Sequence, residues 1–207
     1  ATLKGLTSKD GLRWEFDPQP ASSGRHFEAY GLFHRNREWW VLGQGVSPYF
    51  HLPDGTEHYR VMYGYHSADA TRWDLYPKPL FRYPINSFFP DSSLQNHMGA
   101  AVWDRGRILI GLVGQLWPGG FSATVHMTIG LIYSYDGIEW TEPFPQTPQV
   151  LPGPAGAWDS GCVIFVQRPV SRGDWTHVYY SGFDGGNAWS SRSAIGLATL
   201  RRDGFAA

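Results

Sequence analysis

The chain has 207 residues, which is long enough to form one sizeable hydrophobic core. Its formal net charge of −1 gives no general electrostatic attraction to nucleic acids or anionic membranes. No apolar run approaches the roughly 18 residues of a membrane-spanning helix. We therefore expect neither a nucleic acid nor a membrane among its partners. The single cysteine, Cys162, excludes an internal disulfide and is interpreted as a core residue.

A short turn recurs along the chain. It reads Ser-x-Asp-x-x-x-Trp at 8–14, 67–73 and 134–140, and a shortened copy lies at 201–205. Successive aspartates of these copies are 59, 67 and 67 residues apart. Each aspartate is expected to accept backbone N–H bonds two residues on, and each tryptophan is interpreted as structural. A fixed period of this length is typical of a repeat architecture.

The runs between these turns predict β-strands, because they are rich in β-branched and aromatic residues and lack a sustained helical period. Each period contains a first strand with small residues, a second strand that ends in glycine, a third strand before the turn and a fourth after it. Four strands are the unit of a β-propeller blade. The predicted first strands are 27–33, 97–103 and 159–165; the second are 39–43, 108–114 and 177–182; the third are 1–7, 61–66, 128–133 and 194–200.

We predict an all-β fold, namely a single β-propeller region over residues 1–207 with four-stranded blades. The blade periods are approximately 11–76, 77–143 and 144–207, and residues 1–10 finish a preceding blade. Propellers typically close with 4–8 blades, so we expect these three blades to belong to a larger, five- to seven-bladed propeller. Another chain or copy could also complete the ring. A β-sandwich is the structural alternative, but it does not explain the long, regular spacing.

Several scaffold motifs resemble the propellers of carbohydrate-active enzymes. Besides the turn, they are Val-Leu-Pro-Gly at 150–153, Ala-Trp-Asp at 157–159, Tyr-Tyr-Ser-Gly at 179–182 and Ile-Gly-Leu-Ala-Thr at 195–199. They are similar to glycoside hydrolase families 32, 43, 62 and 68, and to propeller polysaccharide lyases. The resemblance implies an oligo- or polysaccharide partner and favours a secreted or periplasmic location. The Arg-Asp-Pro segment of those hydrolases does not occur in this sequence, so no complete catalytic set is transferred.

In such propellers the starts of the innermost strands line a pocket near the axis. Aligned blades place His97 and Asp159 at one level and Glu28 one residue deeper. Glu28 and Asp159 are catalytic candidates because glycoside hydrolysis uses two carboxylates. Their structural alternatives are an inter-blade hydrogen bond for Glu28 and backbone capping for Asp159. His97 is a candidate general base or acid, with a buried core histidine as the alternative.

Other polar and aromatic residues near these segments are candidates for binding substrate. Arginine could face a uronate carboxylate, and tryptophan could stack on a sugar ring. A structural role is favoured for one of them, His26, and also for Gln44 and Gln115, which end equivalent strands. The candidate substrate-binding residues are Arg25, His26, Arg82, Asn96, Trp117 and Trp158.

These candidates leave three functions open. The first is cleavage of a glycosidic bond by a glycoside hydrolase-like enzyme. The second is a polysaccharide lyase acting on a uronate-containing glycan, with His97 as base or acid. The third is a non-catalytic sugar-binding propeller. We expect no cofactor and assign no metal site, since no spacing of ligands supports one. A calcium ion in an axial channel is an alternative that no motif supports.

Overall fold

The computed structural model describes residues 2–23, 27–46, 60–84, 94–117, 127–186 and 191–205. All the regular secondary-structure elements within these ranges are β-strands, which confirms the predicted all-β class. Among the described residues there is no helix with the length and apolar character needed to span a membrane.

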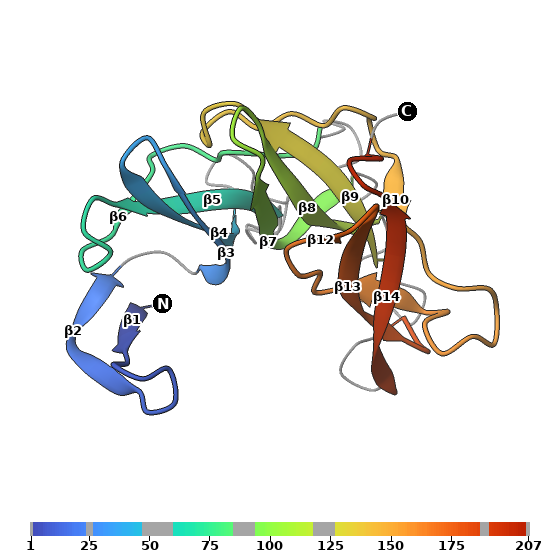
Figure 1. The fold of residues 1–207 in the computed structure, drawn as a ribbon, viewed down its shortest axis with the longest axis horizontal. Helices are drawn as coiled ribbons and strands as arrows, with labels where there is room; N and C mark the ends of the chain where they lie inside the picture. Colours follow the sequence, from blue (N-terminus) through green and yellow to red (C-terminus); the bar gives the residue numbers. More distant parts are fainter. Residues whose placement is uncertain are drawn as a thin grey trace, which may run out of the picture.

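The strands form four antiparallel sheets that follow one another along the chain (Figure 1). Sheet A contains β1 (Thr2–Thr7) and β2 (Glu15–Ser23). Sheet B contains β3 (Glu28–Arg35), β4 (Glu38–Val46), β5 (Arg60–Ser67) and β6 (Asp74–Leu75). Sheet C contains β7 (Gln95–Asp104), β8 (Leu109–Leu116), β9 (Met127–Ser134) and β10 (Pro148–Val150). Sheet D contains β11 (Cys162–Ile164), β12 (Val170–Arg172), β13 (Trp175–Phe183) and β14 (Ser193–Arg201).

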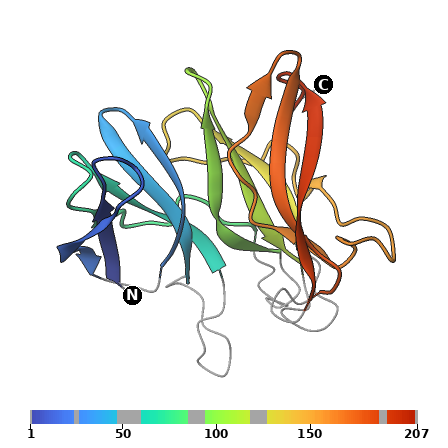
Figure 2. The same ribbon diagram turned by 60° about the horizontal axis from the view of Figure 1, so that its bottom comes forward.

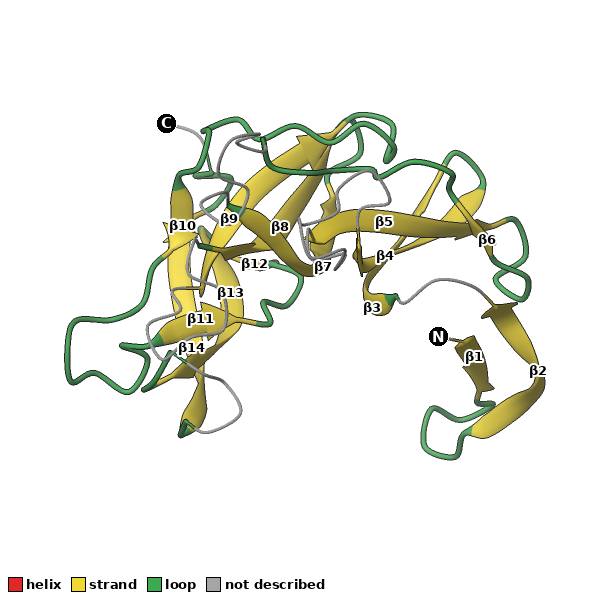
Figure 3. Cartoon of the chain, turned by 180° about the vertical axis from the view of Figure 1, so that it is seen from behind, coloured by secondary structure: helices red, strands yellow, loops and turns green. Residues whose placement is uncertain are grey.

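The four sheets are arranged as a fan, with sheets A and D at its two ends (Figure 1; Figure 3 shows it from behind). Figure 2 shows the same succession from a second direction. Sheets B and C keep their strands in chain order, and their first strands, β3 and β7, pack against each other. Consecutive four-stranded sheets in this arrangement are consistent with part of a β-propeller. The blade boundaries, the blade count and the larger ring stay predictions.

Sheet D differs from sheets B and C because its first strand is interrupted. β14 pairs along the whole of β13 on one edge, whereas β11 and β12 pair with opposite ends of β13. Residues 165–169 lie between β11 and β12, and Phe165 in this break has a φ of 54°. Gln167 still donates its backbone N–H to Tyr179 O at 2.9 Å, so the break stays attached to the sheet.

The hydrophobic core consists of the seams between neighbouring sheets. Between sheets B and C, buried side chains such as Trp40 and Leu42 pack with Val102 and Val113. Between sheets C and D, Leu112, Ile129 and Leu131 pack with Val163 and Val178. Burial of these faces against one another fixes each sheet relative to the next.

The seam between β3 and β7 is closed by small residues. A Cβ atom added to Gly31 on β3 would overlap the backbone carbonyl of Ala100 on β7. A Cβ atom on Gly99 would lie 2.8 Å from the carbonyl oxygen of Leu42 on β4. The backbone of β7 therefore lies closer to the backbones of β3 and β4 than residues with side chains at these glycine positions would allow.

The same hydrogen bonds recur in three Asp-containing turns. Asp10 Oδ1 accepts the N–H groups two and three residues on at 2.8 Å each, and Asp69 Oδ1 does so at 2.8 and 3.1 Å. Asp136 Oδ1 accepts from Ile138 at 2.8 Å and from Glu139 at 2.9 Å. The Asp69 and Asp136 turns follow the third strands of sheets B and C, β5 and β9, whereas the Asp10 turn connects β1 to β2 in the two-stranded sheet A.

Gly31→Ala is expected to lower the free energy of unfolding by more than about 2 kcal/mol, because the new methyl group must separate β3 from β7. Chemical denaturation of the full chain measures this. Gly5→Ala on β1 is the matched control, since its Cβ would meet its nearest described neighbour, Asp17, at an ordinary 3.6 Å. Equal stability of the two variants would contradict the tight seam.

Asp136→Ala is expected to lower the free energy of unfolding by about 1 kcal/mol at neutral pH, because two backbone donors lose their acceptor. Burial acts to raise the pKa of Asp136, but bonds from Glu139 and Ile138 outweigh it and the pKa is lowered. The contribution is therefore present at neutral pH and is lost as the pH falls through this lowered pKa. Asp203→Asn, which removes the charge of an exposed ion pair to Arg105 but keeps a side chain suited to the φ of 59° there, is the control and should change stability much less. Thermal unfolding at several pH values compares the stabilities of the two variants with that of the natural chain.

Candidate functional site

Polar side chains from sheets B and C meet where β3, β5 and β7 begin and β4 ends. We call Glu28, Gln44, Arg60, Gln95 and His97 the polar cluster. Two of these residues, Gln44 and His97, are buried, with exposed fractions of 5% and 7%. Buried polar groups need partners, because an unpaired one costs free energy comparable to a lost hydrogen bond. The contacts within the cluster supply such partners.

Gln44 is the central bridge of this cluster. Its Nε2 donates to Glu28 Oε2 at 3.2 Å, and Glu28 lies directly opposite it in the β3–β4 register. Its Oε1 accepts from Arg60 Nη1 at 3.3 Å and from the backbone N–H of Met98 at 3.0 Å. One amide thus connects two strands of sheet B to the first strand of sheet C, as the structural interpretation of Gln44 predicts.

His97 pairs with a cation rather than with a carboxylate in this cluster. Arg60 Nη1 lies 2.9 Å from His97 Nδ1. A guanidinium can only donate, so Nδ1 accepts and the ring proton of the neutral imidazole is on Nε2. Burial, reinforced by the charge of Arg60, lowers the pKa of His97 to about 3. His97 is therefore neutral at physiological pH.

Arg60 was not among the residues that the sequence singled out. It stands at the first position of β5, and its backbone N–H donates to Gln95 Oε1 at 3.2 Å. Burial lowers the pKa of its guanidinium, and the nearby carboxylate of Glu28 opposes this shift. The only sequence signal was a cation immediately before the apolar run 61–65.

A β-bulge shapes the backbone beside His97. The register between β7 and β8 shifts between His97 and Ala100, and Met98 has a φ of 63°. The side chain of Asn96, which is fully buried, donates from Nδ2 to Met98 O, while Gln44 accepts from Met98 N. Asn96 therefore braces the bulge that directs His97 into the cluster.

A second polar chain runs from the end of β8 toward the outside of sheet C. Trp117 Nε1 donates to Thr128 Oγ1 at 2.7 Å, and Thr128 Oγ1 donates to Gln115 Oε1 at 2.8 Å. Gln115 Nε2 donates to Glu142 Oε1 at 3.3 Å. Burial raises the pKa of Glu142, although a backbone N–H bond from Gln146 and the Gln115 bond oppose it. Gln115 thus joins strands, as its structural interpretation predicts.

Asp159 and Trp158 lie against sheet D. Tyr180 Oη donates to Asp159 Oδ2 at 2.8 Å, and the Trp158 ring stacks on Tyr180 with centroids 6.0 Å apart. Burial, with help from Asp159, raises the pKa of Tyr180 to about 12. In the described ranges, no hydrogen bond or ion pair joins Asp159 to the polar cluster. Trp158 is 44% exposed, so one side of its ring faces solvent.

The remaining predicted binding residues are placed as follows. Arg82 is exposed and lines a separate cavity between sheets B and C, so Arg60 is the cation beside Glu28 and His97. Arg25 and His26 lie outside the described residues. Among the residues that the structure does describe, no three His, Cys, Asp or Glu side chains are grouped so that they could hold a metal ion.

The fold is similar to solved carbohydrate enzymes. An N-acetylgalactosamine deacetylase from F. plautii, in complex with blood group B trisaccharide, matches with a TM-score of 0.64 and 12% identity over 97% of this chain and 61% of that one. A family 117 glycoside hydrolase of Zobellia galactanivorans matches with a TM-score of 0.60 and 14% identity over 98% of this chain and 57% of that one. A GH32 beta-fructofuranosidase of Bombyx mori, in complex with sucrose, matches with a TM-score of 0.60 and 16% identity over 95% and 39%.

These similarities concern the fold. The chain spans 39% to 61% of the length of those three structures. No protein-family model and no curated protein matches the sequence. The predicted resemblance to the propellers of carbohydrate-active enzymes, including glycoside hydrolase family 32, is confirmed as a distant structural similarity.

Stability should fall by about 1–2 kcal/mol between pH 7 and pH 5 because of His97 alone. The unfolded chain binds a proton below the ordinary histidine pKa of about 6.5, whereas folded His97 does so only near 3. Its contribution is therefore present above the ordinary pKa and is lost as the pH falls from there toward 3. Chemical denaturation of the natural chain and of His97→Gln at both pH values isolates the effect. Protonation of folded His97 near pH 6.5, seen by NMR, would contradict the assignment.

Proposed function

We propose that this chain is part of an enzyme that cleaves glycosidic bonds in an oligo- or polysaccharide, in the manner of a glycoside hydrolase, and that the polar cluster is its reaction site. One observation carries the proposal: near the starts of strands from two neighbouring sheets, Gln44 bonds both Glu28 and Arg60, and Arg60 in turn bonds His97. The fold supports it as well, since similar structures include glycoside hydrolases and complexes with saccharides.

The roles that we assign to Glu28, Arg60 and His97 follow from their charges and protonation states. Glu28 is half-buried, and we assign it the carboxylate that exchanges a proton with the glycosidic oxygen or with water. Arg60 places a positive charge next to it and to His97. His97, held neutral with its proton on Nε2, is assigned as a hydrogen-bond donor to a sugar oxygen.

Glycoside hydrolysis requires a second carboxylate. Asp159 is a poor match for that role, because Tyr180 holds its Oδ2 and its side chain packs over Gly182 on β13. We assign Asp159 to anchoring the segment before β11 against sheet D. The proposal therefore assigns Glu28 alone and leaves its partner carboxylate to be identified by mutagenesis.

Elimination by a polysaccharide lyase is a weaker proposal. Arg60 could supply the cation that a uronate carboxylate needs. A lyase must also remove a proton from carbon, however, and a good general base has a pKa near the working pH. His97 has a pKa of about 3 and already accepts a hydrogen bond from Arg60 at Nδ1. These features suit His97 as a hydrogen-bond donor better than as a general base.

Non-catalytic saccharide binding is the third candidate, and the position of Asp159 favours it. A site with one assigned carboxylate can hold sugar hydroxyl groups without cleaving a bond. The absence of an Arg-Asp-Pro segment from the sequence points the same way.

Glu28→Gln is expected to lower kcat at least about 100-fold on a glycan that the full chain cleaves, because the amide cannot exchange a proton. Release of reducing ends from a glycan panel measures hydrolysis. Glu38→Gln, which alters an acid paired with His66 on the same sheet, is the matched control and should remain active.

The reaction products and the binding of saccharide distinguish the three candidate functions. An ultraviolet absorbance from a conjugated C=C bond in the products would show elimination and refute the hydrolase proposal. Saturable saccharide binding without turnover by any member of the panel would indicate a binding protein. Near-normal activity of Glu28→Gln would remove the polar cluster as the reaction site.

A further inference from the structure

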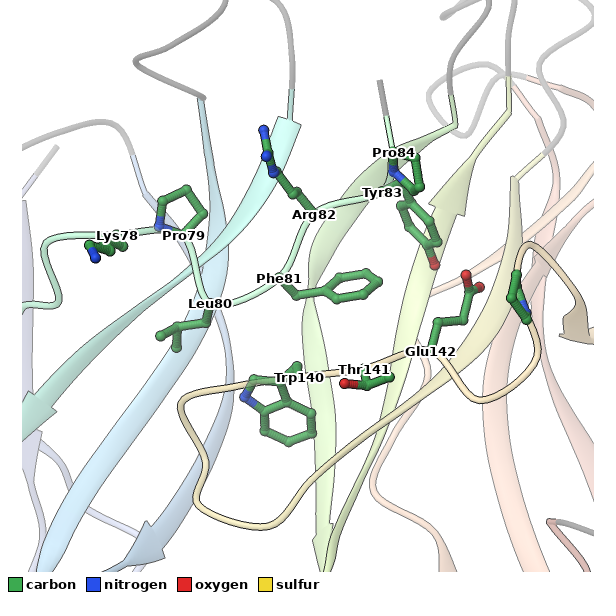
Figure 4. Close-up of a pocket in the computed structure, with 11 residues that line it drawn as sticks. Lys78, Pro79, Leu80, Phe81, Arg82, Tyr83, Pro84, Trp140, Thr141 and Glu142 are labelled. Carbon is green, nitrogen blue, oxygen red and sulfur yellow. The ribbon is translucent and has the colours of Figure 1, made fainter. Parts of the chain in front are cut away.

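A cavity with a volume of about 810 Å³ lies over the seam between sheets B and C. Residues 78–84, which follow β6, form one wall, and residues 140–142 with Pro145, which follow β9, form the other (Figure 4). This volume lies within the range of about 300–1,000 Å³ typical of small-molecule sites. None of the five residues of the polar cluster lines it.

The base of this cavity is rigid because it belongs to the core. Leu80, Phe81 and Trp140 are buried in the seam between sheets B and C. The wall at 78–84 is held to β5 by backbone bonds from Leu80 N to Met62 O at 2.8 Å and from Met62 N to Phe81 O at 2.9 Å. The cavity therefore exists before any ligand arrives, which lowers the entropic penalty of binding.

Two cations line the cavity without a neutralising partner. Lys78 and Arg82 are exposed, and in the part of the chain that the structure describes neither forms an ion pair. The acidic residue of the lining, Glu142, is half-buried and accepts its hydrogen bond from Gln115 instead. In Figure 4, the Arg82 side chain extends away from the buried base, while Glu142 lies on the opposite wall, near Tyr83.

The cavity thus presents positive charge at one side and a hydrogen-bond acceptor at the other. A ligand that satisfies both carries an anionic group and also hydroxyl donors. Arginine binds carboxylate and sulfate groups with two parallel N–H bonds, and lysine adds a point charge. Aromatic and proline side chains complete the lining with apolar surface suited to the faces of a ring.

We propose that this cavity is a secondary binding site for an acidic saccharide, whose carboxylate or sulfate groups are bound by Lys78 and Arg82 at separate positions along one wall while its hydroxyl groups donate to Glu142. The choice of a saccharide rests on the proposed function. The hydrogen-bond chain from Glu142 through Gln115 and Thr128 to Trp117 leads from this cavity to the end of β8. This chain of hydrogen bonds holds the Glu142 side chain in place before a ligand binds.

Isothermal titration calorimetry of the full chain tests the proposal with three probes: trigalacturonate, a sulfated galactose disaccharide and neutral maltotriose. We expect at least one acidic probe to bind at least about tenfold more tightly than maltotriose, and to weaken as salt is added. The stronger of the two acidic probes identifies the anionic group. Lys78→Gln and Arg82→Gln should each weaken that probe about fivefold or more. Arg72→Gln, an exposed arginine on the 67–73 turn, is the matched control and should bind normally.

The secondary site would be overturned by equal binding of maltotriose, by no binding of either acidic probe, or by unchanged binding in a Lys78→Gln, Arg82→Gln double variant. Glu28→Gln distinguishes this site from the polar cluster. We expect the Glu28→Gln variant to bind the acidic probe normally. Loss of binding in this variant would mean that the probe occupies the polar cluster instead. Failure of the full chain to cleave any glycan, with this binding intact, would reject the proposed hydrolase but not the cavity.

Discussion

The close approach of β3 and β7 is the constraint on which the rest of the structure depends. Gly31 leaves no room for a side chain between its backbone and that of Ala100. Because the two strands touch, an amide on β4 can reach the backbone of Met98 on β7. The same proximity lets Arg60 of one sheet bond His97 of the next. The polar cluster is thus a product of how two sheets pack, and neither sheet contains it alone.

Burial then decides the chemistry of these side chains. In water, Arg60 and His97 would both be able to carry positive charge near pH 6. In the seam, desolvation and the neighbouring guanidinium keep the imidazole neutral, while the Glu28 carboxylate supports the arginine. A cation, a carboxylate and a neutral donor are consequently held together without an excess of one charge.

Much of the architecture was predictable because it repeats. The spacing of the Asp turns and the runs between them predict the strands of sheets B and C. Glu28 is the first residue of β3, and His97 is the third residue of β7, because the observed strand starts at Gln95, two residues before its predicted start. Arg60 was not predictable, since its role depends on the β4–β5 register and on the distance between sheets. Alignment of the periods also places Asp159 level with His97, but it cannot reveal that Tyr180 reaches its carboxylate.

The bridging amide of Gln44 also links the polar cluster to the folding of the protein. During folding, sheet B can form its own hairpins before sheet C docks, because its strands are adjacent in the chain. Until docking, Gln44 has no Met98 to bind, and Arg60 has no imidazole to restrain its guanidinium. A half-assembled chain would therefore lack the polar cluster, and formation of these two contacts would report that its two central sheets had come together.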